Sequence, residues 1–220
     1  MQVLGKPFPT FNKCIVERKD HWENVYQTKQ DTDVSWYQEE PTTSLNLIEK
    51  YLNVTGDAFI DVGGGNSNVV AELLQKGYQN LTVLDISKNA ISRTRNKIGE
   101  KGDSINWIES NILDFEPQQQ FQVWHDRATF HFLTDEPEIN QYVQILKKAV
   151  LPKGKVVLAT FSESGPIKCS GLEICQYSSG KIERIFGDDF NVIESFKEVH
   201  TTPFDTEQNF EYFVLEKKGE

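Results

Sequence analysis

The stretch AFIDVGGGNS, residues 58–67, decides the fold of this 220-residue chain. Its first part is a short apolar run with the length of a buried strand, and three consecutive glycines follow it. Glycine tolerates positive φ and lets the backbone approach a ligand closely. Apolar residues at helical spacing come next, at 69–74. The stretch therefore predicts a strand–turn–helix unit whose turn can face a ligand.

The same alternation continues along the chain on both sides of this unit. Strands are expected at 58–64, 81–86, from 105, at 121–126 and at 154–162, and helices at 44–52, 69–74, 87–98, 139–150 and 178–186. Ser44 and Ser87 are expected as N-caps. Two more strand-like runs, 191–200 and 209–217, predict an antiparallel hairpin. The pattern indicates an α/β, Rossmann-like, doubly wound and mostly parallel seven-stranded sheet with a C-terminal antiparallel hairpin, which binds ligands at the carboxyl ends of its strands.

Composition narrows the class of protein further. The chain is 38% hydrophobic, which suits one compact domain, and no apolar run reaches the roughly 20 residues of a membrane span. A start without the apolar core of a signal peptide predicts a soluble, cytoplasmic protein. The net charge of -10 argues against a nucleic-acid partner. Three cysteines without a Cys-x-x-Cys pair, and scattered histidines, predict no bound metal.

An acidic residue strengthens the ligand interpretation of the glycine turn. Asp85 ends the next expected strand, 22 residues after Gly63, where a carboxylate can accept both ribose hydroxyls of an adenosine. A dinucleotide enzyme would place a third glycine three residues after Gly65, where this chain has Asn68. S-adenosylmethionine has no pyrophosphate and needs no such glycine. It is therefore the expected cofactor, and a dinucleotide oxidoreductase is the weak alternative.

With these motifs in place, the sequence resembles the class I S-adenosylmethionine-dependent methyltransferases over roughly residues 20–217. IDVGGGNS looks like their glycine loop, LTVLDIS (81–87) like their acidic loop, ESNILDF (109–115) like their adenine loop, and LPKGKVVLATFS (151–162) like the segment into their fifth strand. HWENVY (21–26), SWYQ (35–38) and HDRATFHFL (125–133) look closest to small methyltransferases. Those include citrate synthase lysine and elongation factor 1A lysine enzymes, and bacterial relatives suspected of acting on thiols or on selenium and tellurium oxyanions.

The resemblance implies a role for each matching position. Residues 1–43 would form an N-terminal cover over the cofactor and residues 44–220 the cofactor-binding domain, with S-adenosylhomocysteine as the product. The cofactor-binding residues it implies are Trp22, Tyr26 and Trp36 in the cover, Gly63 and Gly65 in the turn, Asp85 on the ribose, Ile86, Asn111 and Ile112 at the adenine, and Asp126 facing the methyl group. Asn111 stands where the family usually has an aspartate, and its amide oxygen is expected to accept from the adenine amine.

The methyl acceptor is less well defined by the sequence. His131 and Asp126 are the candidate catalytic groups, and Arg127, His131, Cys169 and Tyr177 the candidate acceptor contacts. Arg127 could pair with an anionic acceptor, and the long segment 164–179 is expected to shape the acceptor pocket. Three functions stay open: methyl transfer to a small or inorganic nucleophile such as a thiol, carboxylate or chalcogen oxyanion, transfer to a protein lysine, and non-catalytic cofactor binding.

Overall fold

The computed structural model describes residues 11–219, and the side chains of its first helix from Arg18 onward. Its α-helices are α1 (Phe11–Thr28), α2 (Thr42–Tyr51), α3 (Val69–Gln75), α4 (Lys88–Ile98), α5 (Glu136–Ala149) and α6 (Ser179–Phe186). Its strands are β1 (Phe59–Val62), β2 (Leu81–Asp85), β3 (Asn106–Glu109), β4 (Phe121–Arg127), β5 (Val150–Phe161), β6 (Lys168–Cys169), β7 (Leu172–Glu173), β8 (Phe190–Thr201) and β9 (Glu207–Lys217). Short 3-10 helices cover η1 (Asp31–Asp33), η2 (Gly99–Ser104), η3 (Ile112–Asp114) and η4 (Phe130–Phe132).

Seven of these strands form one sheet in the order β3-β2-β1-β4-β5-β9-β8. The first five are parallel to one another, whereas β9 runs antiparallel to both β5 and β8. The strand order reverses between β1 and β4, and this is where doubly wound sheets bind ligands. The expected Rossmann-like sheet with its C-terminal antiparallel hairpin is confirmed.

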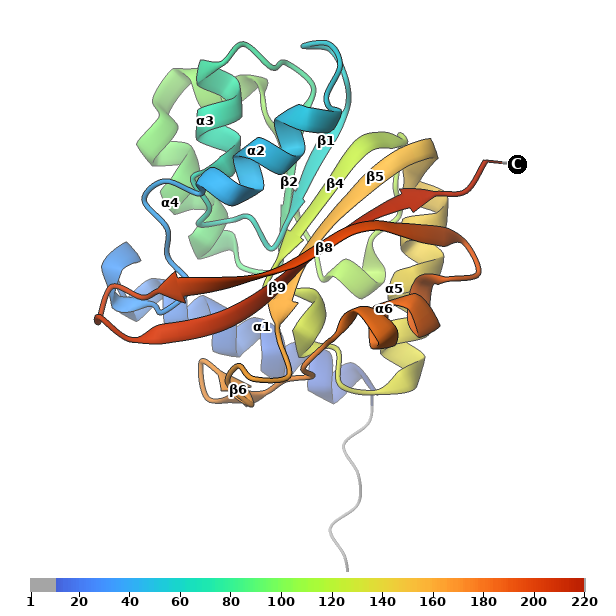
Figure 1. Ribbon diagram of the computed structural model, residues 1–220. Helices are drawn as coiled ribbons and strands as arrows, with labels where there is room; N and C mark the ends of the chain where they lie inside the picture. Colours follow the sequence, from blue (N-terminus) through green and yellow to red (C-terminus); the bar gives the residue numbers. More distant parts are fainter. Residues whose placement is uncertain (1–10, 220) are drawn as a thin grey trace, which may run out of the picture.

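Helices cover both faces of the sheet (Figure 1). One apolar core joins α5 and α6 to one face, through side chains such as Tyr142 and Phe186. A second core joins α2 and α3 to the other face, through Ile48 and Leu73. Because successive side chains of a strand point to opposite faces, both cores draw on the same strands, and those strands are buried on both sides.

Helix α1 occupies a different position from the other helices. It lies across the end of the sheet toward which β5 points, in dark blue in Figure 1. Its residues contact α4 and, through single side chains, β3 and α5. Residues 1–10 of the expected cover segment lie outside the described residues. The rest of that segment places α1 and η1 over the edge of the sheet where the strand–helix turns gather.

Several element boundaries differ from the sequence prediction. Ser44 does not cap α2, because the helix begins at Thr42 and the Pro41 carbonyl already accepts the N–H of Leu45 at 2.9 Å. Helix α5 begins three residues before the predicted start, since Asp135 caps it by accepting the Glu138 N–H. The predicted N-cap at Ser87 is confirmed, with the hydroxyl accepting the N–H of Ala90 at 3.2 Å. Within the long segment 164–179, β6 and β7 form a small separate hairpin.

Candidate functional site

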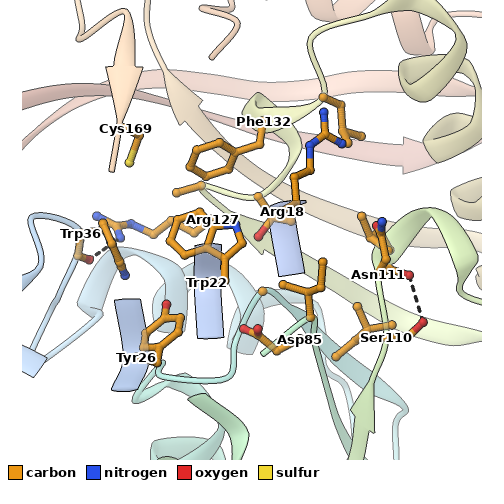
Figure 2. Close-up of a pocket in the computed structure, with 17 residues that line it drawn as sticks. Arg18, Trp22, Tyr26, Trp36, Asp85, Ser110, Asn111, Arg127, Phe132 and Cys169 are labelled. Carbon is orange, nitrogen blue, oxygen red and sulfur yellow. Dashed lines mark hydrogen bonds between the residues drawn. The ribbon is translucent and has the colours of Figure 1, made fainter. Parts of the chain in front are cut away.

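A cavity lies at the carboxyl ends of β1, β2 and β4, beneath α1 (Figure 2). The space that it encloses, counting its open mouth, is about 780 Å³. Its wall consists of Arg18, Trp22, Tyr26, Trp36, Gly63, Leu84, Asp85, Ile86, Ser110, Asn111, Ile112, Arg127, Ala128, Thr129, Phe132, Leu133 and Cys169. Most of the residues predicted from the sequence therefore come together around one space. Arg18 and Phe132 also line the cavity but were not among the predicted site residues. Phe132 lies in the HDRATFHFL segment (125–133) that carries the family resemblance, whereas Arg18 lies in no recognised motif.

The glycine turn forms one wall of this cavity. Gly63 has a φ of +69°, and a Cβ built on it would lie 1.9 Å from Thr129 Oγ1. Only glycine fits there, because both the backbone conformation and the space exclude a side chain. Gly65 is not in the cavity wall; its N–H instead donates to Asp85 Oδ2 at 2.9 Å. The first glycine opens the cavity, and the third one positions the carboxylate.

Asp85 ends β2 and is fixed by backbone groups on both of its oxygens. Oδ1 accepts the N–H of Ser87 at 2.8 Å, and Oδ2 accepts that of Gly65. The residue is only 4% exposed, and burial raises the pKa of its carboxyl to about 6 although the two N–H donors act to lower it. A buried carboxylate held in this way presents its remaining lone pairs to hydroxyl donors in the cavity.

On the same side of Trp22 as Asp85, the cavity wall also carries a donor that has no partner among the described residues (Figure 2). Asn111 Oδ1 accepts the N–H of Leu113 at 3.1 Å, which caps η3 and sets the orientation of the amide. Asn111 Nδ2 is buried and has no partner among the described residues. The Asn111 oxygen, which was expected to accept from the adenine amine, therefore already accepts one backbone N–H and keeps one lone pair, and the amide nitrogen is the group without a partner among the described residues.

Aromatic rings close the cavity from the side of α1. Trp22 packs edge-on against Trp36 and Phe132, with ring centroids 5.6 and 5.1 Å away, and stacks on Tyr26 at 6.2 Å. Figure 2 shows Trp22 in the middle of the view, with Trp36 and Tyr26 on one side and Asp85 and Asn111 on the other. Trp22 and Tyr26 are four residues apart and share one face of α1.

Charged side chains hold α1 in this position. Arg18 makes a bidentate contact with Glu138 of α5, at 2.7 and 2.9 Å, and the Glu138 side chain is only 4% exposed. Glu23 accepts from the Ser87 hydroxyl and from the backbone N–H groups of Lys88 and Asn89 at the start of α4. A carboxylate at a helix N-terminus meets unpaired N–H groups and the positive end of the helix dipole.

Arg127, at the end of β4, is a cation that has no acidic partner among the described residues. Its Nη1 donates to the Trp36 carbonyl at 2.8 Å, and its guanidinium lies 4.5 Å from the centroid of the Phe210 ring. Its Nε and Nη2 are buried and have no partner among the described residues. These two nitrogens form one edge of the guanidinium plane, the edge that binds a carboxylate or similar anion with two parallel hydrogen bonds.

Asp126 does not face the cavity. Its Oδ1 accepts the N–H groups of Thr129 and Phe130 at 2.9 and 3.1 Å, and its Oδ2 accepts the Tyr142 hydroxyl at 2.7 Å. It is fully buried, and burial raises its pKa to about 6. The expected contact with the methyl group is therefore corrected: Asp126 braces the turn after β4, because its side chain points to the face covered by α5.

The remaining candidate residues separate into one in the cavity wall and two outside it. Cys169 lines the cavity, and burial raises the pKa of its thiol to about 12, so the thiol stays protonated at neutral pH. His131 is completely buried, with its ring 4.8 Å from that of Phe161, and burial lowers its pKa to about 3. Tyr177 packs on Phe130 at 4.9 Å. Neither His131 nor Tyr177 is part of the cavity wall, so the structure does not bring these two residues together with the other candidates.

A second cavity of about 490 Å³ adjoins the first, on the other side of Gly63 and Arg127. Its wall includes Gly64, Asn66 and Ser67 of the glycine turn, together with Trp36 and Tyr37. It also includes three polar residues of the sheet and α2, namely Ser44, Asp61 and His125. Within the described residues, no group of three or more His, Cys, Asp or Glu side chains gathers as for a metal ion. Among the helices of residues 11–219, none combines the length and apolar character needed to cross a bilayer.

Known proteins show the same combination of sheet and turn. A family model described as "Methyltransferase domain" matches residues 59–154, from the start of β1 into β5. A mouse (Mus musculus) "eEF1A lysine and N-terminal methyltransferase" is 30% identical over 144 residues, which cover 63% of this chain and 19% of that protein. A zebrafish (Danio rerio) "EEF1A lysine methyltransferase 2" is 29% identical over 162 residues, covering 64% of this chain and 67% of that protein.

The fold has close counterparts among solved structures. The Burkholderia thailandensis 1,6-didemethyltoxoflavin-N1-methyltransferase, solved with S-adenosylhomocysteine, superposes with a TM-score of 0.71 at 11% identity and covers 98% of this chain and 93% of its own. At that identity the likeness concerns the fold alone. The family match over the glycine turn and Asp85, the curated relatives and the sheet order agree. Residues 59–154 therefore match a methyltransferase domain, and the chain is similar to S-adenosylmethionine-dependent methyltransferases.

Proposed function

We propose that this chain transfers the methyl group of S-adenosylmethionine to a small acceptor that carries a negative charge. Residues 44–220 would bind the donor, and the described part of residues 1–43 would cover it. The observation that carries the choice of acceptor is Arg127, whose guanidinium edge is buried at the cavity wall without a partner among the described residues.

The polar groups of the first cavity suit the adenosine part of the donor. The two ribose hydroxyls are donors, and Asp85 is an acceptor buried within the wall. The adenine ring nitrogens are acceptors, and they match the unsatisfied Nδ2 of Asn111. Ile86 and Ile112 line the same end of the cavity and provide apolar contact for the base. Donor and acceptor roles therefore pair at both ends of an adenosine.

The residues of this chain act mainly by orientation and by excluding water. Bound S-adenosylmethionine supplies an activated methyl group on a sulfonium sulfur, which is its own leaving group. The protein then has to align an acceptor and close the site, which is the part suited to Trp22, Trp36 and Phe132. An acceptor that is already an anion needs no general base. This agrees with a cavity wall whose one carboxylate, Asp85, is held by backbone N–H groups.

Arg127 favours an anionic acceptor over an ammonium group. A buried guanidinium costs free energy unless an anion satisfies it, and its edge at Nε and Nη2 matches a carboxylate or a chalcogen oxyanion. A protonated lysine would be repelled by that charge, and it would also have to lose a proton before attack. Thiolates, carboxylates and oxyanions avoid both costs.

The test compares Arg127→Met and Arg127→Lys with the wild-type protein. Isothermal titration would give the affinity for S-adenosylhomocysteine and for 5′-methylthioadenosine, which lacks the amino-acid part. Radiolabelled donor would then be offered with thiols, carboxylates, selenite and tellurite, and with cell lysate separated into protein and small-molecule fractions. We expect label in small molecules, and a rise of about tenfold or more in the acceptor KM of Arg127→Met with little change in donor affinity.

Two outcomes would contradict this assignment. Label found only in the protein fraction would exclude a small acceptor. A loss of affinity for S-adenosylhomocysteine but not for 5′-methylthioadenosine would mean that Arg127 binds the carboxylate of the donor, and the argument for an anionic acceptor would then lose its basis. Arg127→Lys keeps the positive charge but lacks the two parallel N–H donors of the guanidinium, so its acceptor KM should lie between those of the wild-type protein and Arg127→Met.

A protein lysine acceptor is the second candidate. It is favoured by the relatives, whose names describe lysine methyltransferases of elongation factor 1A, and by the aromatic lining of the cavity mouth. The separated lysate distinguishes the two candidates directly. If label enters protein, mass spectrometry of the labelled band should place the methyl group on a lysine.

A further inference from the structure

Three buried polar side chains form a continuous hydrogen-bonded chain beside the second cavity. His125 Nδ1 lies 2.6 Å from Asp61 Oδ1, and His125 Nε2 lies 2.9 Å from Ser44 Oγ. None of the three is more than 2% exposed. They come from three elements, β1, β4 and α2, so the chain joins the middle of the sheet to the helix packed on it.

The chemistry of these three side chains determines which group donates and which accepts in each hydrogen bond. An ionised carboxylate only accepts hydrogen bonds, so His125 Nδ1 carries the hydrogen and donates it to Asp61. In the neutral ring Nε2 accepts the hydroxyl hydrogen of Ser44, which fixes the tautomer. The parallel register places His125 directly beside Asp61 on the neighbouring strand. Ser44 of α2 therefore fixes the orientation of the imidazole, and the imidazole holds Oδ1 of the Asp61 carboxylate.

The second oxygen of Asp61 is left over. Oδ2 is buried and has no partner among the described residues. A Cβ built on Gly64 would lie 2.3 Å from it, so Oδ2 stands against the glycine turn. Asp61, His125 and Ser44 all belong to the wall of the second cavity. A buried acceptor without a donor costs free energy, and a cationic nitrogen in this cavity would satisfy it.

We propose that His125 and Ser44 are positioning residues, which hold Asp61 so that Oδ2 is aimed at a cationic nitrogen of the ligand in the second cavity. This rests on the proposed function, in which the ligand is the methyl donor and its amino-acid end carries the ammonium group. His125 and Ser44 act through Asp61 and do not themselves contact the transferring methyl group. Without this relay, the hydrogen-bonded series Ser44–His125–Asp61, the hydrogen bond that fixes Asp61 Oδ1 is lost and the orientation of the carboxylate is no longer set from the side of α2.

The relay serves no evident purpose in packing alone. Residues that fill this region of the core, such as Phe59 and Val123, are apolar, and an apolar side chain at position 125 would pack there without an ionisable partner. Buried ionic and polar networks stabilise proteins little compared with apolar residues of similar volume. Their advantage is to fix one orientation, which suits a positioning role.

The experiment compares His125→Leu, His125→Asn and Ser44→Ala with the wild-type protein. Titration with S-adenosylhomocysteine and with 5′-methylthioadenosine separates the amino-acid end from the adenosine. His125→Leu should lose about tenfold or more in affinity for S-adenosylhomocysteine and keep its affinity for 5′-methylthioadenosine. His125→Asn places an amide N–H where Nδ1 stands and should recover most of the loss, whereas Ser44→Ala should fall between His125→Asn and His125→Leu.

Other outcomes overturn the relay. An equal loss for both ligands would show a merely structural role, and no loss for either would show that Asp61 needs no support. Equal affinity of the wild-type protein for both ligands would mean that nothing recognises the amino-acid end. Failure of the wild-type protein to bind either ligand would overturn the proposed function, and the relay with it. If His125→Leu does not fold, Ser44→Ala and His125→Asn still test the relay. Ser44→Ala must lower the affinity for S-adenosylhomocysteine but not for 5′-methylthioadenosine, and His125→Asn must keep most of the affinity for S-adenosylhomocysteine.

Discussion

Replacing Asp85 removes the acceptor on which the adenosine part of the donor site depends. In Asp85→Asn the shape is kept, but one oxygen becomes an NH₂ group. Both carboxylate oxygens accept backbone N–H groups, from Ser87 and Gly65, so the new NH₂ must face one of these donors. The asparagine can therefore accept from only one of the two backbone N–H groups, and its NH₂ group faces the other one.

The expected loss follows from the number and kind of hydrogen bonds. A hydrogen bond to a charged group contributes roughly 1.5–3 kcal/mol, and two ribose hydroxyls would donate to this carboxylate. The two together amount to roughly 3–6 kcal/mol, or a loss of about 10²–10⁴ in affinity. Isothermal titration with S-adenosylhomocysteine measures this directly. Adenine as ligand is the control, since it has no ribose and should bind the variant and the wild-type protein alike.

Folding must be measured in parallel, because Asp85 also supports the glycine turn. Circular dichroism and thermal unfolding without ligand would report whether the sheet survives. A well-folded Asp85→Asn variant that binds S-adenosylhomocysteine within about threefold of the wild-type affinity would refute the placement of the ribose on Asp85.

Three further predictions concern the turn, the cover and pH. Gly63→Ala should destabilise the protein by about 2 kcal/mol or more in a urea titration, since the new Cβ adds both positive-φ strain and a clash with Thr129 Oγ1. The control is Gly77→Ala, at a φ of +92° with nothing within 4 Å, which should show the strain alone. Equal losses of stability in the two variants would contradict this. Arg18→Met should lower the melting temperature and weaken S-adenosylhomocysteine binding several-fold, because it leaves buried Glu138 without its partner, and unchanged values for both would show that α1 is held otherwise. Burial raises the pKa of Asp85 to about 6, and the ribose hydroxyls bind the ionised form. The affinity for S-adenosylhomocysteine should therefore fall as pH falls through about 6, by up to about tenfold per pH unit, and should be constant above about 7. Asp85→Asn should remove this pH dependence.

The donor half of the site was predictable because it depends on local order along the chain. In a parallel sheet the turns after neighbouring strands meet at one edge, so Gly63 and Asp85 had to lie close together once their strands were recognised. Ile86, Asn111 and Ile112 follow from the same rule. Trp22 and Trp36 came from family resemblance, since no periodicity connects α1 to the end of the sheet.

The acceptor half depends on which face of β4 each side chain takes. Trp124 and Asp126 point to α5, where both connect to the Tyr142 hydroxyl, whereas His125 and Arg127 point to the other face. A strand alternates with a period of two, but the period alone does not say which residues face the helix and which the ligand. Asp126 was therefore expected in the cavity and is in the core.

What the sequence by itself determined about this protein is the order of its elements, its sheet and the position of its ligand turn. Apolar runs, glycines and Asp85 specify these locally, because each depends on residues that are neighbours in the chain. Only the tertiary structure decided that Arg127 and Asn111 keep nitrogens without a partner among the described residues, and that Ser44, His125 and Asp61 meet. Ser44 and His125 are 81 residues apart. Whether two such polar groups satisfy each other depends on packing between elements, and no local pattern records that.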